Sequence, residues 1–461
     1  MIIDRIFTPS LAQVAYLIAD EASGEVGVVD PRRDVAAYLD WAESRNLRIT
    51  AIFETHVHAD FVSGGPELAA ATGATLYASR LGNQEVPHQP LDDGDEVRIG
   101  SLVVRALWTP GHTPEHLSYL LIDPARGDAP IAVFTGDALF VGDVGRPDLL
   151  GAERTDELMP QLFMTVSERF ASLPDETIVY PGHTAGSSCG KKIGDAPDST
   201  IGAERRANYA FRQPDVEAFA RAVMTDMPLA PTYYPELKRV NRVGPAALSG
   251  LAVAGPLPVS EVAALQANGA LVVDTRSPAA FGAGHIPGAV SVGWGPNFLT
   301  WMGWLAPYDR EVVVIVDDPA TVAEMQVELQ RIGLDRLAGF LDGGMSAWIA
   351  AGQPVETVAQ ITVRELAAEQ GGEDRSPVLD VRGADEFRAG HVAGAQNVFL
   401  GAIAQGADVP FALDEPFMVF CGTGYRSAVT SSLLQARGYT GLVNVVGGMA
   451  AWQEAELPVQ S

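Results

Sequence analysis

Short apolar runs alternate with helical patterns in the first part of the chain. Buried strands are predicted at residues 15–18, 26–29 and 49–53, and the amphipathic spacing of residues 34–46 predicts a helix. Further strands are predicted at residues 103–107, 117–122, 131–134 and 178–180. Several of these strands run into loops that carry histidine or aspartate. Loops at strand ends are where α/β proteins usually place their functional residues.

The C-terminal half of the chain repeats itself. Three segments occur twice in the same order, namely VDTR and LDVR, GHIPGA and GHVAGA, and GGMSAW and GGMAAW. Two homologous domains of about 100 residues each explain this pattern. We therefore expect a first domain over residues 1–250, a Gly/Ala/Pro-rich linker, and two repeats over residues 258–355 and 360–461.

Charge and composition narrow the function classes. The chain has 461 residues and a formal net charge of -27, which disfavours nucleic acid and anionic membranes as partners. The N-terminus lacks the basic start and apolar run of an export signal, and no apolar stretch reaches the roughly 18 residues of a membrane span. There are two cysteines, far apart in sequence, which excludes a disulfide framework. These features predict a cytoplasmic protein.

Histidine and aspartate gather at the predicted strand ends. Six of the eight histidines lie before residue 184. The motif HxHxD supplies His56, His58 and Asp60 after one strand. Three later strands are followed by His112, Asp137 and His183. Because strand-end loops converge on one rim of a sheet, these side chains can meet around a metal ion.

These four motifs resemble the metallo-β-lactamase superfamily over residues 1 to about 200. The resemblance implies an αββα sandwich, so the whole chain is expected to be an α/β multi-domain protein. One position departs from the two-zinc hydrolases of that superfamily, which have histidine directly after the aspartate of HxHxD. Here that residue is Phe61, which cannot bind metal. A stable binuclear site is therefore not expected.

The segments ETHVHAD and GDVGRPD resemble the persulfide dioxygenase branch of the superfamily. This resemblance implies one Fe(II) per chain, held by His56, His112 and Asp137, and two imidazoles with one carboxylate suit an iron that activates O2. His58, Asp60 and His183 would then support these ligands or mark a second metal position that has been lost. Zinc is the expected metal if the domain is instead a hydrolase.

Two further residues of the first domain are candidates for substrate chemistry. Cys189 has small neighbours and is followed by Lys191 and Lys192, which would expose its sulfur and lower its pKa. An inert buried cysteine is the alternative, and the sequence does not choose between them. Fusions of this dioxygenase with rhodanese modules resemble the chain here too, which implies that Cys189 can carry persulfide sulfur. Arg146 is a candidate clamp for a carboxylate or phosphate.

The second repeat carries a strand, a tight loop and a helix start in the sequence VFCGTGYRS. The loop residues Gly422, Thr423, Gly424 and Tyr425 follow Cys421, and their N–H groups, the helix N-terminus and Arg426 would together stabilise a thiolate or persulfide anion. This loop resembles the active site of rhodanese, whose sheet is parallel. In the first repeat Val316 and Thr321 replace the nucleophile and the cation, so that repeat is expected to be silent, as a spacer, an interface or a docking surface.

The expected function is oxidation of a low-molecular-weight thiol persulfide by O2 to sulfite, coupled to sulfane-sulfur transfer at Cys421 that forms or uses thiosulfate. The carrier thiol would be glutathione, coenzyme A or a similar small thiol. Relatives of this kind include homo-oligomers. A zinc thioester hydrolase resembling glyoxalase II fused to a sulfurtransferase, and a non-catalytic sulfur carrier, are the alternatives.

Overall fold

A computed structural model describes residues 1–372 and 375–460. The chain divides into two compact units. The first consists of residues 1–251 with residues 330–333, and the second consists of residues 252–329 with residues 334–461. Within the described parts of the chain, no helix is long and apolar enough to cross a lipid bilayer.

The first unit contains two six-stranded sheets. The strands of one sheet, in spatial order, are β1 (Ile2–Thr8), β2 (Gln13–Asp20), β3 (Glu25–Val29), β4 (Arg48–Phe53), β5 (Thr75–Ser79) and β6 (Gln89–Leu91). The strands of the other are β12 (Ser199–Thr200), β11 (Ile178–Pro181), β10 (Pro130–Gly136), β9 (Leu117–Ile122), β8 (Leu102–Trp108) and β7 (Glu96–Ile99). Both sheets mix parallel and antiparallel neighbours.

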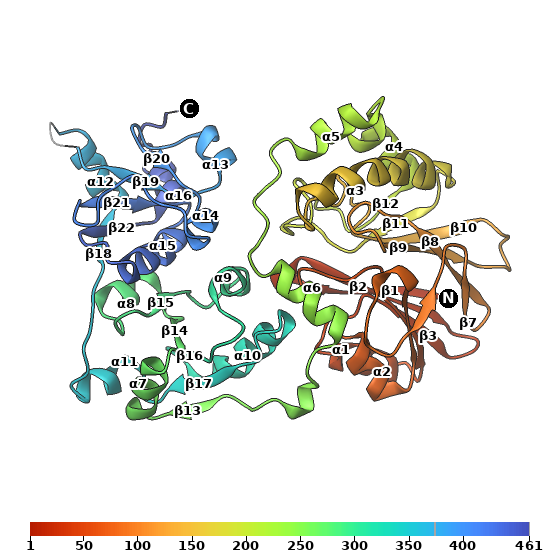
Figure 1. The fold of residues 1–461 in the computed structure, drawn as a ribbon, viewed down its shortest axis with the longest axis horizontal. Coiled ribbons are helices and arrows are strands. Elements are labelled where there is room, and N and C mark those ends of the chain that lie inside the picture. Colours follow the sequence, from red (N-terminus) through yellow and green to blue (C-terminus); the bar gives the residue numbers. More distant parts are fainter. Residues whose placement is uncertain (373–374, 461) are drawn as a thin grey trace. The chain divides into compact units, whose positions relative to one another are not determined.

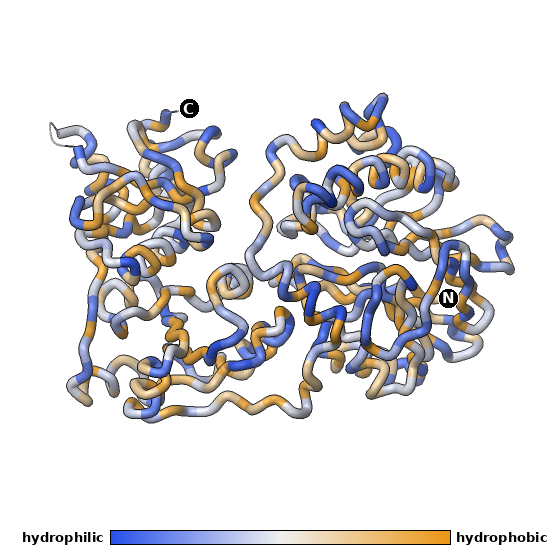
Figure 2. Tube along the Cα trace, in the orientation of Figure 1, coloured by the Kyte–Doolittle hydropathy of each residue, from blue (hydrophilic) through white to orange (hydrophobic). Residues whose placement is uncertain are grey.

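Helices cover the outer face of each sheet, as Figure 1 shows for the first unit. They are α1 (Ala36–Glu43) and α2 (Gly65–Thr72) on one sheet and α3 (Ala152–Met164), α4 (Ile201–Ala207) and α5 (Val216–Met224) on the other, whereas α6 (Tyr234–Val243) is bonded to the loop that follows β4. Strand β2 is buried along its whole length because alternate side chains enter different cores. Tyr16 and Ile18 pack between the sheets, whereas Ala15 and Leu17 pack under α1 and α2. This two-sided burial explains the continuous apolar runs, which are orange in Figure 2.

The second unit contains two five-stranded sheets whose paired strands are all parallel. The first sheet consists of β13 (Gly255–Leu257), β17 (Leu337–Leu341), β16 (Val312–Ile315), β14 (Leu271–Asp274) and β15 (Val290–Ser291). The second consists of β18 (Ala359–Thr362), β22 (Leu442–Val446), β21 (Phe417–Phe420), β19 (Val378–Asp380) and β20 (Gln396–Asn397). The identical strand orders agree with the sequence repeat.

Each parallel sheet has its own helices and its own hydrophobic core. The helices of the first repeat are α7 (Val259–Ala267), α8 (Pro278–Ala283), α9 (Phe298–Leu305), α10 (Val322–Arg331) and α11 (Gly344–Ala350). Those of the second are α12 (Val363–Gln370), α13 (Ala384–Ala389), α14 (Leu400–Ala404), α15 (Tyr425–Ala436) and α16 (Gly448–Glu454). The predicted fold class, an αββα sandwich followed by two parallel α/β domains, is confirmed.

Candidate functional sites

Four strand-end loops of the first unit meet at one rim of the sandwich. His56 and His58 follow β4, His112 lies between β8 and β9, and Asp137 and His183 follow β10 and β11. One potential ligand atom from each of His56, His112 and Asp137 lies within 4.8 Å of the others, and all three residues are buried. The loops pack so closely that a Cβ atom at Gly145 would lie 1.8 Å from the carbonyl oxygen of Asp137.

Hydrogen bonds orient both imidazoles toward the carboxylate. His112 donates from Nδ1 to the carbonyl oxygen of Arg146 at 2.8 Å, and His56 donates from Nδ1 to Thr55 Oγ1 at 2.9 Å. Thr55 in turn donates to Asp30. These partners fix the tautomer that leaves each Nε2 as an acceptor. The Nε2 atoms of His112 and His56 lie 3.5 and 3.9 Å from Asp137 Oδ2.

The polar atoms that face one another here have no protein partner. Among the described residues, His56 Nε2 and both carboxylate oxygens of Asp137 are buried without a hydrogen bond. Burial lowers the pKa of His56 and His112 well below the usual range and raises the pKa of Asp137 to about 6. Buried polar atoms without partners are costly, and neutral imidazoles beside a carboxylate are the form that binds a metal ion. The residues therefore fit a metal ion.

Two carboxylates hold His58 through one of its ring nitrogens. Its Nε2 lies 3.1 Å from Asp30 Oδ1 and 3.2 Å from Glu54 Oε2. Burial opposes protonation, but the two carboxylates raise the pKa of His58 well above its ordinary value. The other ring nitrogen of His58, Nδ1, is buried without a hydrogen-bond partner among the described residues. Sequence reasoning missed Asp30 and Glu54, although Glu54 is part of the ETHVHAD motif.

Asp60 and His183 form a second buried group, which Cys189 completes. Potential ligand atoms of the three residues lie within 4.8 Å of one another, and His183 Nε2 is 3.0 Å from Asp60 Oδ2. Phe61 turns its ring against His58, with a centroid separation of 4.3 Å. The sequence pointed to Cys189 as a sulfur carrier but gave no sign that its thiol lies with Asp60 and His183.

Of the two alternatives that the sequence left open for Cys189, the structure shows a buried cysteine. The thiol is buried, and burial together with the Asp60 and Asp137 carboxylates raises its pKa to about 12. Lys191 does not lower it, because its Nζ atom donates to the carbonyl oxygens of Ala222 and Thr225. Lys191 therefore ties this segment to Ala222 and Thr225 at the end of α5.

Arg146 is likewise used inside the fold. Its guanidinium binds both carboxylate oxygens of Asp148, at 2.6 and 2.8 Å, and donates to the carbonyl oxygens of Ser188 and Pro228. Only 1% of the residue is exposed. The expected role as a substrate clamp is corrected by this geometry, because the cation is already paired. Arg146 instead ties the loop after Asp137 to the segment that carries Cys189.

In the second unit, Cys421 follows β21 and begins the loop that leads into α15. The N–H group of Gly424 donates to Cys421 Sγ at 3.2 Å, and Ser427 Oγ lies 3.5 Å from the same sulfur. Gly424 has φ +91°, and a Cβ atom there would lie 3.0 Å from the backbone nitrogen of Gly447. The turn therefore requires glycine. The loop thus places an N–H group and the N-terminus of α15 beside the sulfur, an arrangement that suits the binding of an anion there.

Arg426 forms a two-point ion pair with Glu386, with separations of 2.6 and 2.7 Å. Burial opposes ionisation of Glu386, but Arg426 lowers the pKa of the carboxyl below its ordinary value. Sequence reasoning missed Glu386. The signal was present, because the first repeat has Ala280 at the position of Glu386 and Thr321 at the position of Arg426, so the two charges are lost together.

The loop of the first repeat that corresponds to the Cys421 loop is held by a hydrogen bond within the loop. Asp318 Oδ1 accepts from the N–H group of Ala320, which caps a short 3-10 turn before α10. This repeat also contacts the Cys421 loop and its helix. Tyr425 donates from its hydroxyl to the carbonyl oxygen of Gly293 at 3.0 Å, and Ser291 N donates to Ser432 Oγ at 3.0 Å. The first repeat therefore supports the helix behind Cys421.

Comparisons with known proteins agree with this architecture. The sequence profile described as Metallo-beta-lactamase superfamily matches residues 9–183, and that described as Rhodanese-like domain matches residues 258–351 and 362–455. A crystal structure of a metallo-beta-lactamase from Staphylococcus aureus subsp. aureus COL is 33% identical, with a TM-score of 0.66, and the similarity covers 74% of this chain and 98% of that one. The chain belongs to the metallo-β-lactamase superfamily, and its metallo-β-lactamase domain is followed by two rhodanese-like domains.

The relatives carry two different activities. A hydroxyacylglutathione hydrolase from Methylobacterium sp. (strain 4-46) is 34% identical over 39% of this chain and 65% of its own length. The human mitochondrial persulfide dioxygenase ETHE1 is 29% identical over 40% of this chain and 68% of its own length. The chain thus spans just under two thirds of the first relative. Membership of the superfamily implies an enzyme with a metal site, and the choice of reaction depends on the site itself.

Proposed function

We propose that the first unit oxidises a low-molecular-weight thiol persulfide with O2 and that Cys421 transfers sulfane sulfur. In the oxidation, the S–S bond of the persulfide breaks and its terminal sulfur becomes sulfite. One O2 and one water supply the three oxygen atoms, the thiol is released, and two protons are lost. The four electrons that leave the sulfur reduce the O2, so the step needs no further oxidant.

The observation that carries this proposal is the asymmetry of the metal-binding rim. A two-zinc hydrolase of this superfamily has a histidine directly after the aspartate of HxHxD, and this chain has the apolar Phe61 there, so the position beside Asp60 and His183 lacks one nitrogen ligand. What remains is His56, His112 and Asp137. Two imidazoles and one carboxylate with open positions suit a non-haem Fe(II).

The protein's own residues prepare this site in three ways. Thr55 and the Arg146 carbonyl orient the two imidazoles, and burial keeps them neutral. Asp137 supplies negative charge, and the apolar ring of Phe61 closes the adjacent position. Iron held there would supply the activation of O2.

At Cys421 the proposed chemistry is nucleophilic. The thiolate attacks the outer sulfur of thiosulfate, the S–S bond breaks, and sulfite leaves with the bonding electrons. A thiol then accepts the sulfane sulfur and frees Cys421. The reverse sequence combines persulfide sulfur with sulfite from the first unit to form thiosulfate. In both directions the Gly424 N–H group and Arg426 are suited to stabilise the anion.

Metal analysis combined with oxygen uptake tests the first part. We expect one iron per chain, oxygen consumption on addition of glutathione persulfide, and one sulfite per O2. Protein loaded with two zinc ions that hydrolyses a glutathione thioester and consumes no oxygen would contradict the proposal.

The zinc thioester hydrolase is the second candidate. It is favoured by the relatives named hydroxyacylglutathione hydrolase and by the group of Asp60, His183 and Cys189, which offers three donors beside Asp137. In that case two metals per chain would accompany thioesterase activity. A sulfur carrier without catalysis would show neither oxygen uptake nor hydrolysis, while Cys421 would still accept sulfur.

A further inference from the structure

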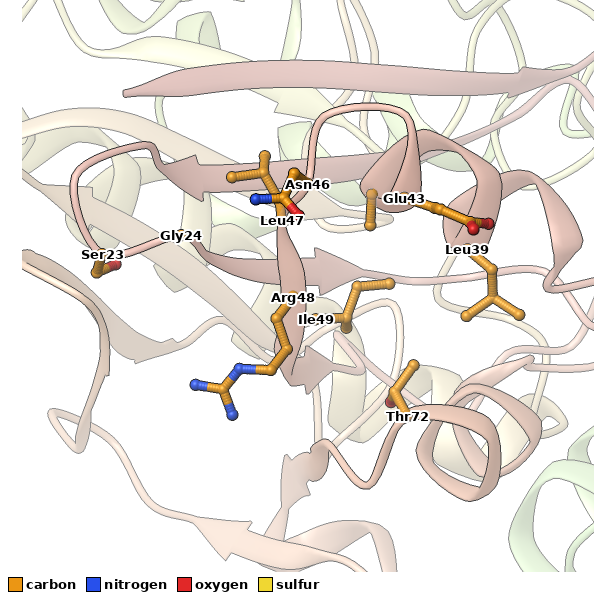
Figure 3. A pocket seen from close by; sticks show the side chains of 10 residues that line it. Ser23, Gly24, Leu39, Glu43, Asn46, Leu47, Arg48, Ile49 and Thr72 are labelled. Atoms are coloured by element: carbon orange, nitrogen blue, oxygen red, sulfur yellow. The ribbon is translucent and has the colours of Figure 1, made fainter.

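The cavities of the first unit differ in what they offer a ligand. One of about 620 Å³ lies beside α1, where Glu43 and Arg48 are the charged residues (Figure 3). Arg48 already faces Glu25, at 3.5 Å. A second cavity, of about 330 Å³, lies beside α6 and receives three cations from that one helix, Lys238, Arg239 and Arg242. The second cavity is therefore the one that offers positive charge to a ligand.

The cations of α6 are unequal. Arg239 is bound at two points by Glu236, at 2.8 and 2.6 Å. Lys238 and Arg242 lie one turn apart and so share a face of the helix. The hydrophilic character of α6 is visible as a run of blue positions in Figure 2. In a chain with a net charge of -27, a cavity of this sign favours an anionic ligand.

Helix α6 is fixed directly over the metal-binding loop. Asn241, which is buried, donates from Nδ2 to the carbonyl oxygens of His58 and Phe61 at 2.9 and 2.7 Å. Its Oδ1 accepts from the N–H group of Ser63 at 2.8 Å. These three hydrogen bonds hold α6 against the loop that also carries His56.

The cavity also adjoins the metal site through its other walls. It is lined by Val57, which stands between His56 and His58, and by Glu115, whose carboxylate accepts from the Val57 N–H group at 3.0 Å. A molecule in the cavity therefore lies next to the metal ligands.

We propose that this cavity binds the anionic part of the carrier thiol, with Lys238 and Arg242 contacting its carboxylate or phosphate groups and its sulfur directed toward His56, His112 and Asp137. The inference rests on the proposed function, because it names the class of thiol that presents the persulfide. Leu150 and Pro235 add apolar walls for the stem of the molecule. A volume of about 330 Å³ is at the lower end for ligand pockets, which suits one charged end of a small thiol.

Calorimetric binding to the metal-loaded full chain tests this inference. The probes are S-methylglutathione, its dimethyl ester, and desulfo-coenzyme A, none of which has a free thiol to bind the metal. We compare wild type with Lys238→Gln and Arg242→Gln. Arg98→Gln is the matched control, because it removes one exposed positive charge on β7, outside the cavity.

We expect Lys238→Gln to weaken binding of the charged probe at least about tenfold and Arg242→Gln to weaken it about threefold. The control and the dimethyl ester should show no such loss. Binding of S-methylglutathione indicates carboxylate recognition, and binding of desulfo-coenzyme A indicates phosphate recognition. Equal affinity of ester and acid, or an unchanged Kd in both α6 variants with normal iron content and circular dichroism, would overturn the inference.

Failure of the proposed function gives a different pattern. If wild type consumes no oxygen with any persulfide while Lys238→Gln still loses affinity for the probe, the cavity is an anion site and the dioxygenase proposal falls. If oxygen uptake is normal and Lys238→Gln changes neither the Kd of the probe nor the KM for glutathione persulfide, the dioxygenase stands and the cavity inference falls.

Discussion

Replacement of Phe61 by histidine should convert the metal-binding rim into a site for two metals. Phe61 is 1% exposed and directly follows Asp60, whose carboxylate oxygens are buried without hydrogen-bond partners among the described residues. An imidazole at position 61 would join Asp60, His183 and Cys189, which already lie together. The second position would then have a nitrogen ligand in place of an apolar ring.

The size of the effect follows from burial. Burying an imidazole in place of the phenyl ring, without a partner, costs about 1–3 kcal/mol. For a unit of this size, each kcal/mol shifts the Tm by roughly 2–4 °C, so the metal-free variant should melt roughly 2–12 °C lower. Zinc at 100 times its Kd would return about 2.7 kcal/mol, provided that it binds only the folded state.

Metal content and thermal melting check this reasoning. The Phe61→His variant should bind two metals per chain, and added zinc should raise its Tm. Phe61→Leu is the matched control, because it removes the ring and adds no ligand, so zinc should leave its Tm unchanged. If Phe61→His still binds one metal and zinc shifts both variants equally, the residue at position 61 is not what limits the second metal.

Four further outcomes are expected. His112→Ala should abolish oxygen consumption and leave sulfur transfer from thiosulfate to cyanide intact, and loss of both activities in folded protein would contradict separate sites. Cys421→Ser should stop thiosulfate formation and let sulfite accumulate, because serine cannot hold a transferable sulfur; an unchanged thiosulfate yield would refute this role. Asp317→Ala should leave both activities near wild type, since the first repeat has no nucleophile, and a drop in either rate would count against a silent loop. Arg426→Gln should lower the stability of the second unit by up to about 1 kcal/mol, because its pair with Glu386 is partly exposed. The lowered pKa of Glu386 makes this difference present above pH 4.5, and it should disappear as the pH falls through the lowered value, which urea unfolding at several pH values can measure.

Much of the candidate site could be predicted because its chemistry is carried by local motifs. His56 follows a strand of one sheet, and His112 and Asp137 follow strands of the other, and loops at strand ends gather at the rim of such a sandwich. The loop from Cys421 to Arg426 is contiguous, so its anion-binding geometry is encoded in a few adjacent residues. The absence of a cysteine from the corresponding loop of the first repeat was equally visible, because it is the property of a single residue, Val316.

The roles of Cys189, Arg146 and Lys238 depend on partners far away in sequence. The lysines adjacent to Cys189 left an activated thiol open as one of two alternatives, but burial and the carboxylates of Asp60 and Asp137 raise the pKa of the thiol. Arg146 looked free in sequence and is bound by Asp148 and by carbonyl oxygens of distant segments. Sequence spacing carries no information about such pairings.

The sequence by itself determined the order of the domains and the candidate ligands at the strand ends. It also determined the absence of a nitrogen ligand at position 61 and the presence of the loop that carries Cys421 in the second repeat. Only the tertiary structure decided that Asp30 and Glu54 hold His58, that Cys189 lies with Asp60 and His183, and that α6 lines a cationic cavity beside the metal ligands. The physical reason is that ligand identity is a property of residue type at a position, whereas burial and electrostatic environment arise from segments that meet only when the chain folds.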